Sequence, residues 1–181
     1  MSRPYLIATL GYPGSGKTYF SEHLARQEGF FHLNADRERL ALFKKPQYTS
    51  EEHQVLSKAM DRSAEELLKK GISVIYDVNF NRAIQRKRIQ GIAERTDAQY
   101  RLVHLVTSPS TALERVRTRG RDATEDPELY RPIDSNIFHR MKNEIEEAGV
   151  SEPVITINGE ASFEKQLTQF RESVTQGSGT P

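Results

Sequence analysis

The sequence predicts an α/β fold in which a five-stranded parallel sheet lies between two layers of helices, as a three-layer α/β/α sandwich. Short apolar runs typical of strands alternate with helix-like segments along the whole chain. Such alternation predicts right-handed βαβ units, and therefore a parallel sheet with helices on both faces. A length of 181 residues, with 36% hydrophobic and 28% charged residues, suits one globular domain with a full core.

Five apolar runs are expected to form the strands, because each is short and rich in residues that favour β structure. In chain order they are YLIATL, FFHL, ISVIY, YRLVHLV and PVITI, at residues 5–10, 30–33, 72–76, 100–106 and 153–157. The first run ends at a glycine-rich loop and the third at Asp77. In sheets of this kind the functional site lies beyond the carboxyl ends of the strands.

The segments between these runs are expected to be helical. A helix over residues 17–28 would place Phe20 and Leu24 at near-helical spacing. Ser50 is expected to cap a longer helix that ends at Gly71, since serine favours helix starts and glycine favours helix ends. The other helices are expected at residues 36–43, 82–95, 109–119, 134–148 and 161–175.

The positions of glycine and proline residues indicate where the domain has loops and where it ends. Residues 120–132 contain Gly120 and two prolines and are expected to form a loop or a mobile lid. We expect residues 1–175 to form one domain and residues 176–181 to be a flexible tail.

The net charge of +1 argues against a strongly basic nucleic-acid coat protein, and the absence of cysteine excludes disulfides and thiolate metal sites. Glycines break the apolar run near the N-terminus, so we expect no signal peptide, no membrane partner and a cytoplasmic location.

The sequence GYPGSGKT at residues 11–18 matches G-x-x-x-x-G-K-[ST], after a predicted strand and at the start of a predicted helix. Its glycines let backbone N–H groups turn toward phosphates, and the helix N-terminus adds a positive dipole. Lys17 is expected to reach the β- and γ-phosphates, and Thr18 to bind Mg²⁺. The motif predicts a P-loop NTPase fold that binds a nucleoside triphosphate, ATP, with Mg²⁺ and no other metal. The residues expected to hold the nucleotide from this loop are Gly11, Pro13, Gly14, Ser15, Gly16, Lys17 and Thr18.

Other patterns restrict the class of P-loop protein. The chain contains neither the Asn-Lys-x-Asp motif nor an Asp-x-x-Gly after a strand, which argues against a regulatory GTPase. Asp77 ends a hydrophobic strand as a Walker B aspartate would, but Val78 follows it in place of the glutamate that polarises water in many mechanical ATPases. These absences favour a small kinase, which transfers phosphate to an acceptor and not to water.

A kinase needs a group that activates the acceptor and a group that holds it. Asp36, just after the second predicted strand, can accept the proton of an acceptor hydroxyl; the alternative is an aspartate that caps a helix. Arg39, three residues on and on the same helical face, can bind an acceptor phosphate. The alternative for Arg39 is a surface arginine paired with Glu38 or Glu22.

Three further charged residues are candidates. Asp77 can orient Arg39, the acceptor or the metal shell, or it can be a structural carboxylate. Arg115 and Arg119, which are expected to bind the nucleotide, are four residues apart in the run ERVRTRGRD and share a helical face. Arg119 lies where the predicted helix becomes the predicted lid, so it can bring positive charge to the γ-phosphate in the transition state. The alternative is a solvated basic helix end.

Four segments carry a resemblance to known proteins: GYPGSGKT, LNADRERL, IYDVNFNRAIQRKR and LERVRTRGRD. Over roughly residues 5–145 the chain resembles the P-loop 5′-OH polynucleotide kinases, and the wider set of small kinases that includes zeta toxins and antibiotic phosphotransferases. The resemblance implies that Lys17 and Thr18 act on the phosphates and Mg²⁺. The other roles that it implies are a general base at Asp36, acceptor binding at Arg39, Asp77 and Asn79, and a lid arginine at Arg119.

The sequence leaves more than one class of acceptor possible. A polynucleotide 5′ end would need a basic groove and a stacking aromatic ring. Candidates are Lys44, Lys45, Arg82, Arg86, Lys87 and Arg88 for the groove, and Tyr48 and Phe80 for stacking. The basic residues can equally form a solvated helix face. A small hydroxyl metabolite, nucleoside or antibiotic is the alternative acceptor, and a nucleotide-binding switch without transfer activity is the non-enzymatic alternative. The five histidines show no ligand spacing and are expected at the surface or in packing.

Overall fold

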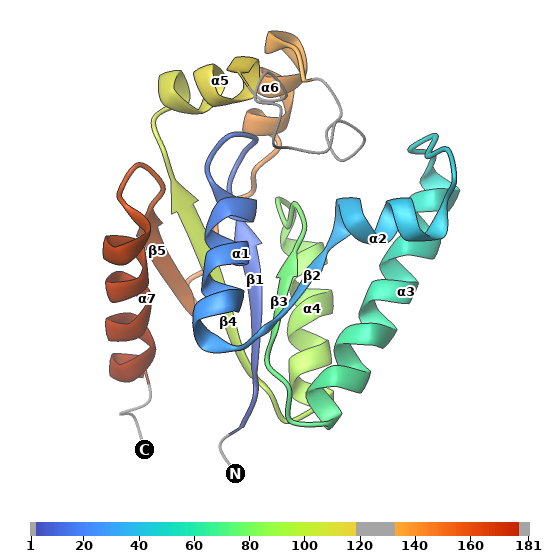
Figure 1. Ribbon diagram of the computed structural model, residues 1–181, viewed down its shortest axis with the longest axis vertical. Coiled ribbons are helices and arrows are strands. Elements are labelled where there is room, and N and C mark those ends of the chain that lie inside the picture. The colour runs from blue at the N-terminus through green and yellow to red at the C-terminus, as the bar shows by residue number, and fades with distance from the viewer. Residues whose placement is uncertain (1–2, 119–132, 178–181) are drawn as a thin grey trace.

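The computed structural model describes residues 3–118 and 133–177, which form a central sheet with helices on both sides (Figure 1). The sheet has five strands in the order β2-β3-β1-β4-β5, and every neighbouring pair is parallel. The predicted α/β fold with a five-stranded parallel sheet is thus confirmed. The strands are β1 (Tyr5–Leu10), β2 (Phe31–Asn34), β3 (Val74–Asp77), β4 (Gln99–Val106) and β5 (Val154–Asn158).

The central strand β1 is buried on both faces, as expected for a parallel sheet between two helical layers. Leu6, Ala8 and Leu10 face a core that they share with α3 and α4, whereas Ile7 faces a core that it shares with α1 and α7. The helices of these two layers are α1 (Lys17–Glu28), α3 (Ser50–Lys69), α4 (Ala83–Arg95) and α7 (Phe163–Gly177).

Three shorter helices surround the carboxyl edge of the sheet. Helix α2 (Ala35–Leu42) continues directly from β2 and packs against α3. Helices α5 (Pro109–Thr118) and α6 (Ser135–Asn143) lie beyond the carboxyl ends of the strands, at the top of Figure 1. A small core of Ala112, Val116 and Phe138 joins α5 to α6. The predicted lid at 120–132, together with Arg119, falls outside the described residues.

Two expected helix boundaries are wrong. Thr49, and not Ser50, is the N-cap of α3, since its Oγ1 accepts a hydrogen bond of 3.2 Å from the N–H of Glu52. Helix α6 ends at Asn143, although the sequence predicted a helix to residue 148. The N–H of Glu146 donates to the carbonyl oxygen of Asn81 at 2.8 Å and so cannot continue the helix, and the carbonyl groups at 146 and 147 accept hydrogen bonds from a buried arginine.

Candidate nucleotide-binding site

The loop between β1 and α1 has the backbone that the P-loop motif requires. Gly14 and Gly16 have φ angles of 78° and 98°, which favour glycine. A Cβ atom at Gly14 would lie 2.2 Å from the carbonyl oxygen of Ala112 in α5, so only glycine fits between the loop and that helix. The hydroxyl of Ser15 is buried without a hydrogen-bond partner among the described residues. The loop therefore fits an oxygen-rich ligand such as a triphosphate.

Lys17 lies at the centre of this loop. Its Nζ donates hydrogen bonds to the carbonyl oxygens of Gly11 at 2.7 Å and Tyr12 at 3.1 Å, and the residue is only 9% exposed. Thr18 follows in the first turn of α1 and is half-buried. The loop thus holds the ammonium group against its own carbonyl oxygens, and contact of Lys17 with phosphates stays a prediction.

Residues that follow β4 and β5, together with one from α5, support the loop from outside. Thr107 donates from its Oγ1 to the carbonyl oxygen of Ser15 at 2.9 Å. Gly159, just after β5, approaches so closely that a Cβ atom there would lie 2.1 Å from the Thr107 hydroxyl. Arg115 donates to the carbonyl oxygens of Gly159 at 2.9 Å and Gly14 at 3.4 Å. Sequence reasoning missed Thr107 and Gly159, because no motif marks them; their positions just after predicted strands are the one signal that could have suggested them.

Tyr12 joins the P-loop to α6. Its hydroxyl donates to the carbonyl oxygen of Thr107, and its ring packs edge-on against Phe138 with centroids 5.7 Å apart. Burial raises the pKa of the Tyr12 hydroxyl, and the charge of Glu160 raises it further, so the group remains a donor at neutral pH.

Asp77 ends β3 next to the P-loop strand and is 4% exposed. Its Oδ2 accepts hydrogen bonds from His32 Nε2 at 2.9 Å and Asn34 Nδ2 at 2.8 Å. Burial works to raise the pKa of Asp77. The hydrogen bond and charge of His32, the hydrogen bond from Asn34 and the charge of Lys17 nevertheless hold that pKa below its ordinary value. Sequence reasoning did not identify His32 and Asn34 as partners, although both lie in the strand that precedes Asp36, which Asn34 ends.

Asp36 is exposed in the first turn of α2. The N-cap of this helix is Asn34, whose Oδ1 accepts from the backbone N–H groups of Asp36 at 3.1 Å and Arg37 at 3.0 Å. The alternative in which Asp36 itself caps the helix is therefore wrong.

Arg39 is buried between α2 and α3, with 4% of its surface exposed. Its Nη2 donates to Nδ1 of His53 at 2.9 Å, and its guanidinium lies over the ring of Tyr48, 4.7 Å from the centroid. Its Nη1 is 3.6 Å from the carboxylate of Glu52. Burial lowers the pKa of His53 and the charge of Arg39 lowers it further, against the opposing charge of Glu52; this favours the neutral ring that can accept the bond. The alternative of an exposed surface arginine is wrong.

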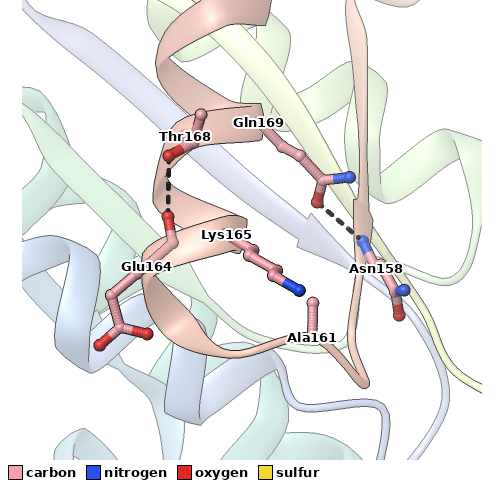
Figure 2. Close-up of a pocket in the computed structure, with 6 residues that line it drawn as sticks. All are labelled: Asn158, Ala161, Glu164, Lys165, Thr168 and Gln169. Carbon is pink, nitrogen blue, oxygen red and sulfur yellow. Dashed lines mark hydrogen bonds between the residues drawn. The ribbon is translucent and has the colours of Figure 1, made fainter.

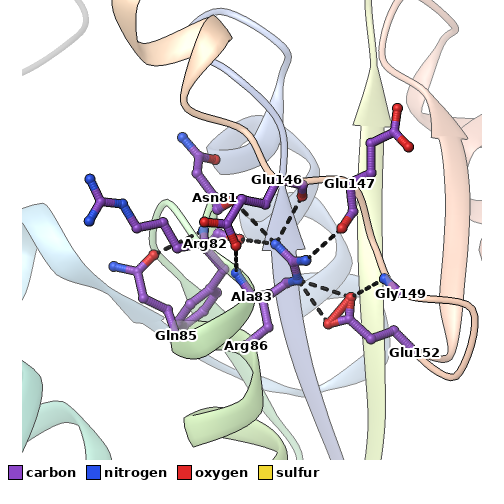
Figure 3. A network of polar contacts seen from close by, with 10 residues as sticks. Asn81, Arg82, Ala83, Gln85, Arg86, Glu146, Glu147, Gly149 and Glu152 are labelled. Atoms are coloured by element: carbon purple, nitrogen blue, oxygen red, sulfur yellow. Dashed lines mark hydrogen bonds and ion pairs between the residues drawn. The ribbon is translucent and has the colours of Figure 1, made fainter.

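Arg86 does not belong to a nucleic-acid groove, contrary to the sequence interpretation. It is 0% exposed and donates to both carboxylate oxygens of Glu152, at 2.8 and 3.0 Å (Figure 3). Its remaining N–H groups donate to the carbonyl oxygens of Phe80, Asn81, Glu146 and Glu147. The arginine thus ties α4 to the segment between α6 and β5.

A stacking candidate, Phe80, and a second groove candidate, Arg88, also have structural partners. Phe80 is 1% exposed and packs against Tyr76 with ring centroids 5.2 Å apart, so it cannot stack on a base. Arg88 pairs with Asp61 of α3. The candidates that remain exposed are Asn79 after β3 and the basic residues Lys44, Lys45, Arg82, Lys87 and Arg88.

A separate cavity of about 410 Å³ lies between the edge strand β5 and α7 (Figure 2). It is lined by Asn158, Ala161, Glu164, Lys165, Thr168 and Gln169. None of the described residues with a predicted role in the site lines it. No helix in the described ranges has the length and apolar character that a membrane crossing requires.

Comparisons with solved structures show the same fold. A protein from Chloroflexus aurantiacus that is described as a putative kinase superposes with a TM-score of 0.71 at 21% identity, covering 98% of this chain and 99% of that chain. A gluconokinase from Sinorhizobium meliloti gives a TM-score of 0.66 at 14% identity, covering 97% of this chain and 94% of that chain. A chain of the Pnkp1/Rnl/Hen1 RNA repair complex gives 0.65 at 19% identity, covering 80% of this chain and 45% of that chain.

A comparison with curated protein sequences finds no match. A family model described as "AAA domain" matches residues 6–147, the segment that contains the P-loop, Asp36, Asp77 and Arg115. This match extends over more than half of the chain, and the protein belongs to that AAA domain family.

Proposed function

We propose that this protein is an ATP-dependent kinase that transfers the γ-phosphate of ATP to a hydroxyl group of an acceptor. The observation that carries the proposal is the order of the strands. Strand β3, which ends at Asp77, lies between β1, which leads to Lys17, and β2, which leads to Asp36. A phosphate-binding cation and two carboxylates therefore follow three adjacent strands at one edge of the sheet, where ligands bind in this type of fold.

Each of these residues has a role in the proposal. Lys17 binds the β- and γ-phosphates, and the P-loop amides bind their remaining oxygens. Asp36 accepts the proton of the acceptor hydroxyl, and its exposure leaves room for an acceptor to approach. Thr18 would hold Mg²⁺, which when bound neutralises charge on the phosphates. Arg115 supports the loop from α5, and Arg119 is assigned to the transition-state charge.

The residue after Asp77 supports transfer to an acceptor over hydrolysis. Val78 has no group that can polarise a water molecule, and its carbonyl oxygen accepts a hydrogen bond of 3.3 Å from Thr9. Asp77 itself is 4% exposed, and its Oδ2 already accepts hydrogen bonds from His32 and Asn34. We assign it, with Asn79, to the acceptor or the metal shell.

For the acceptor we propose the 5′-hydroxyl end of DNA or RNA. The support is Arg39, whose buried Nη1 lies 3.6 Å from the carboxylate of Glu52 but has no hydrogen-bond partner among the described residues, and whose guanidinium lies over the ring of Tyr48. A phosphodiester next to the acceptor hydroxyl can satisfy such a guanidinium, and an aromatic ring can stack on a base. The likeness to a chain of an RNA repair complex agrees with this acceptor.

A small hydroxyl metabolite is the second candidate. The observation in its favour is that Arg86, Arg88 and Phe80 have structural partners, which leaves fewer basic and aromatic groups for an oligonucleotide. The likeness to a gluconokinase and to a sugar kinase from Janibacter agrees with this candidate.

An acceptor panel separates these possibilities. Transfer of labelled γ-phosphate from ATP would be measured with 5′-OH DNA and RNA oligonucleotides, gluconate, neutral sugars, nucleosides and an aminoglycoside. Labelling of oligonucleotides, lost in Asp36→Asn, supports the proposal, and labelling of a small molecule alone replaces the proposed acceptor. ATP binding without transfer to any acceptor contradicts the kinase proposal and favours a nucleotide switch. Oligonucleotides that already carry a 5′-phosphate are the matched control, because they lack the acceptor hydroxyl.

A further inference from the structure

The side chain of Asn34 joins the end of β3 to the start of α2. Its Nδ2 donates to Oδ2 of Asp77 at 2.8 Å. Its Oδ1 accepts from the N–H groups of Asp36 at 3.1 Å and Arg37 at 3.0 Å. Asn34 is 6% exposed, so water competes little for these bonds. Because the amide is planar, the direction of the bond to Asp77 fixes the direction of the bonds to α2.

Capping α2 does not require this link. A helix cap needs one oxygen acceptor, which a serine or threonine hydroxyl provides. Thr49 caps α3 and Asp134 caps α6 with a single oxygen each. Within the described part of the chain, neither of these two capping side chains also donates a hydrogen bond to a strand of the sheet. Capping α2 therefore uses only the Oδ1 of Asn34 and does not account for the hydrogen bond that its Nδ2 donates.

We propose that Asn34 is a positioning residue, which holds the first turn of α2, and with it Asp36, at a fixed place relative to the carboxylate of Asp77. This inference rests on the proposed kinase function, in which Asp36 acts on the acceptor and Asp77 lies beside Lys17. His32 gives Asp77 a second donor on the same oxygen, at 2.9 Å, and so fixes the carboxylate to which Asn34 binds. Errors of about 1 Å in the placement of a reacting group cost roughly a hundredfold in rate, which is why such a link matters.

Two pairs of variants separate the link from the cap. Asn34→Ser keeps an oxygen for the cap and removes the donor to Asp77, whereas Asn34→Ala removes both. Asp77→Asn keeps an acceptor for Asn34, whereas Asp77→Ala removes it. Ser73→Ala is the control, because it removes a hydrogen bond of 2.9 Å with Tyr5 at the opposite end of β3.

The first readout is steady-state kinetics of phosphate transfer. We expect Asn34→Ser to lower kcat about tenfold or more, with the KM for ATP within about twofold of wild type and a melting temperature close to wild type. Asn34→Ala should lower kcat similarly and also lower the melting temperature. Wild-type kcat in Asn34→Ser overturns the proposal, and so does a loss of kcat that Ser73→Ala reproduces.

The second readout does not depend on transfer. Hydrogen exchange of the Asp36 and Arg37 amides would be measured by NMR in the Asp77 variants. Asp77→Ala should speed this exchange about tenfold, although Asp77 does not bind these amides, and Asp77→Asn should retain wild-type protection. Unchanged exchange in Asp77→Ala, with active wild-type enzyme, overturns this inference alone. Faster exchange in a protein that transfers phosphate to no acceptor overturns the proposed function and leaves the link between Asp77 and α2 standing.

Discussion

The guanidinium of Arg115 donates a hydrogen bond of 2.9 Å to the carbonyl oxygen of Gly159, and so connects α5 to the loop after β5. The same nitrogen lies 3.4 Å from the carbonyl oxygen of Gly14 in the P-loop. A loop that turns its N–H groups toward phosphates directs carbonyl groups away from them, and here an arginine binds one of those carbonyls. Arg115 thus supports the nucleotide-binding loop from outside.

Replacement of Arg115 by alanine is expected to weaken ATP binding about tenfold. The substitution removes the hydrogen bonds from the charged guanidinium to two loops. A tenfold loss of affinity corresponds to about 1.4 kcal/mol of binding free energy, which is about half of what one such hydrogen bond contributes at most. Isothermal titration with a non-hydrolysable ATP analogue measures the effect. Arg117→Ala is the matched control, because Arg117 is exposed on the same helix and its guanidinium donates to the Ser135 hydroxyl at 3.4 Å, away from the P-loop. Equal affinity of both variants would contradict the assignment.

Gly14→Ala is expected to abolish nucleotide binding. The new Cβ would meet the carbonyl oxygen of Ala112 at 2.2 Å, in a backbone conformation that also disfavours alanine. Gly29→Ala separates these two causes, since Gly29 has a φ angle of 69° but a Cβ atom there would have no heavy atom within 4 Å. We expect Gly29→Ala to cost about 1 kcal/mol of stability and to leave binding intact. ATP binding by Gly14→Ala, measured with a fluorescent analogue, would show that α5 can move away from the loop.

Replacement of Arg86 by alanine is expected to destabilise the protein by about 3–5 kcal/mol, because it leaves the charge of Glu152 without its arginine partner and several carbonyl groups without their donor. Urea unfolding followed by circular dichroism measures this loss. Lys87→Ala, on the exposed side of the same helix, should change stability by less than about 0.5 kcal/mol. A stable Arg86→Ala protein with weakened oligonucleotide binding would restore the groove interpretation.

The sequence predicted the parts of this protein whose causes are local. The five strands follow from short apolar runs, and the P-loop follows from eight consecutive residues between a strand and a helix. Local patterns could not reveal the burial of Arg86, because its partner Glu152 is 66 residues away. For the same reason His32 appeared to be an ordinary histidine, since its bond to Asp77 spans 45 residues.

In the candidate site too, the sequence predicted what local residues determine and not what the packing of distant elements determines. Lys17 lies within the loop because the motif itself builds that loop, and its contact with phosphates stays a prediction. The surroundings of Arg39 depend on how α2 packs against α3, which spacing along the chain does not determine. A basic residue in a run of charged residues gives no indication of whether it faces water or a carboxylate from another helix.

Arg39→Lys is expected to raise the KM for the acceptor about tenfold or more and to leave the KM for ATP unchanged. Lysine keeps the charge but lacks the planar group that lies over Tyr48 and donates to His53. Arg37→Lys is the matched control, since Arg37 is exposed on the same helix and lies 3.6 Å from Glu22. Steady-state kinetics with the acceptor identified by the panel provides the measurement. Parallel changes in both KM values would indicate a structural role for Arg39.

Asp77 is expected to make the stability of the protein depend on pH on the acid side. Its pKa in the folded protein is held below the ordinary value of 3.8, so its contribution is fully present above about pH 4. The contribution is then lost as the pH falls through the lowered pKa, because the folded state must take up a proton that disrupts the bonds from His32 and Asn34.

Urea unfolding between about pH 2.5 and pH 6 should therefore give a steeper decrease of the free energy of unfolding toward acid pH for wild type than for Asp77→Asn. Asp97→Asn, on an exposed turn, should keep the wild-type slope. An equally steep decrease in Asp77→Asn would mean that Asp77 is not the carboxylate that governs acid unfolding.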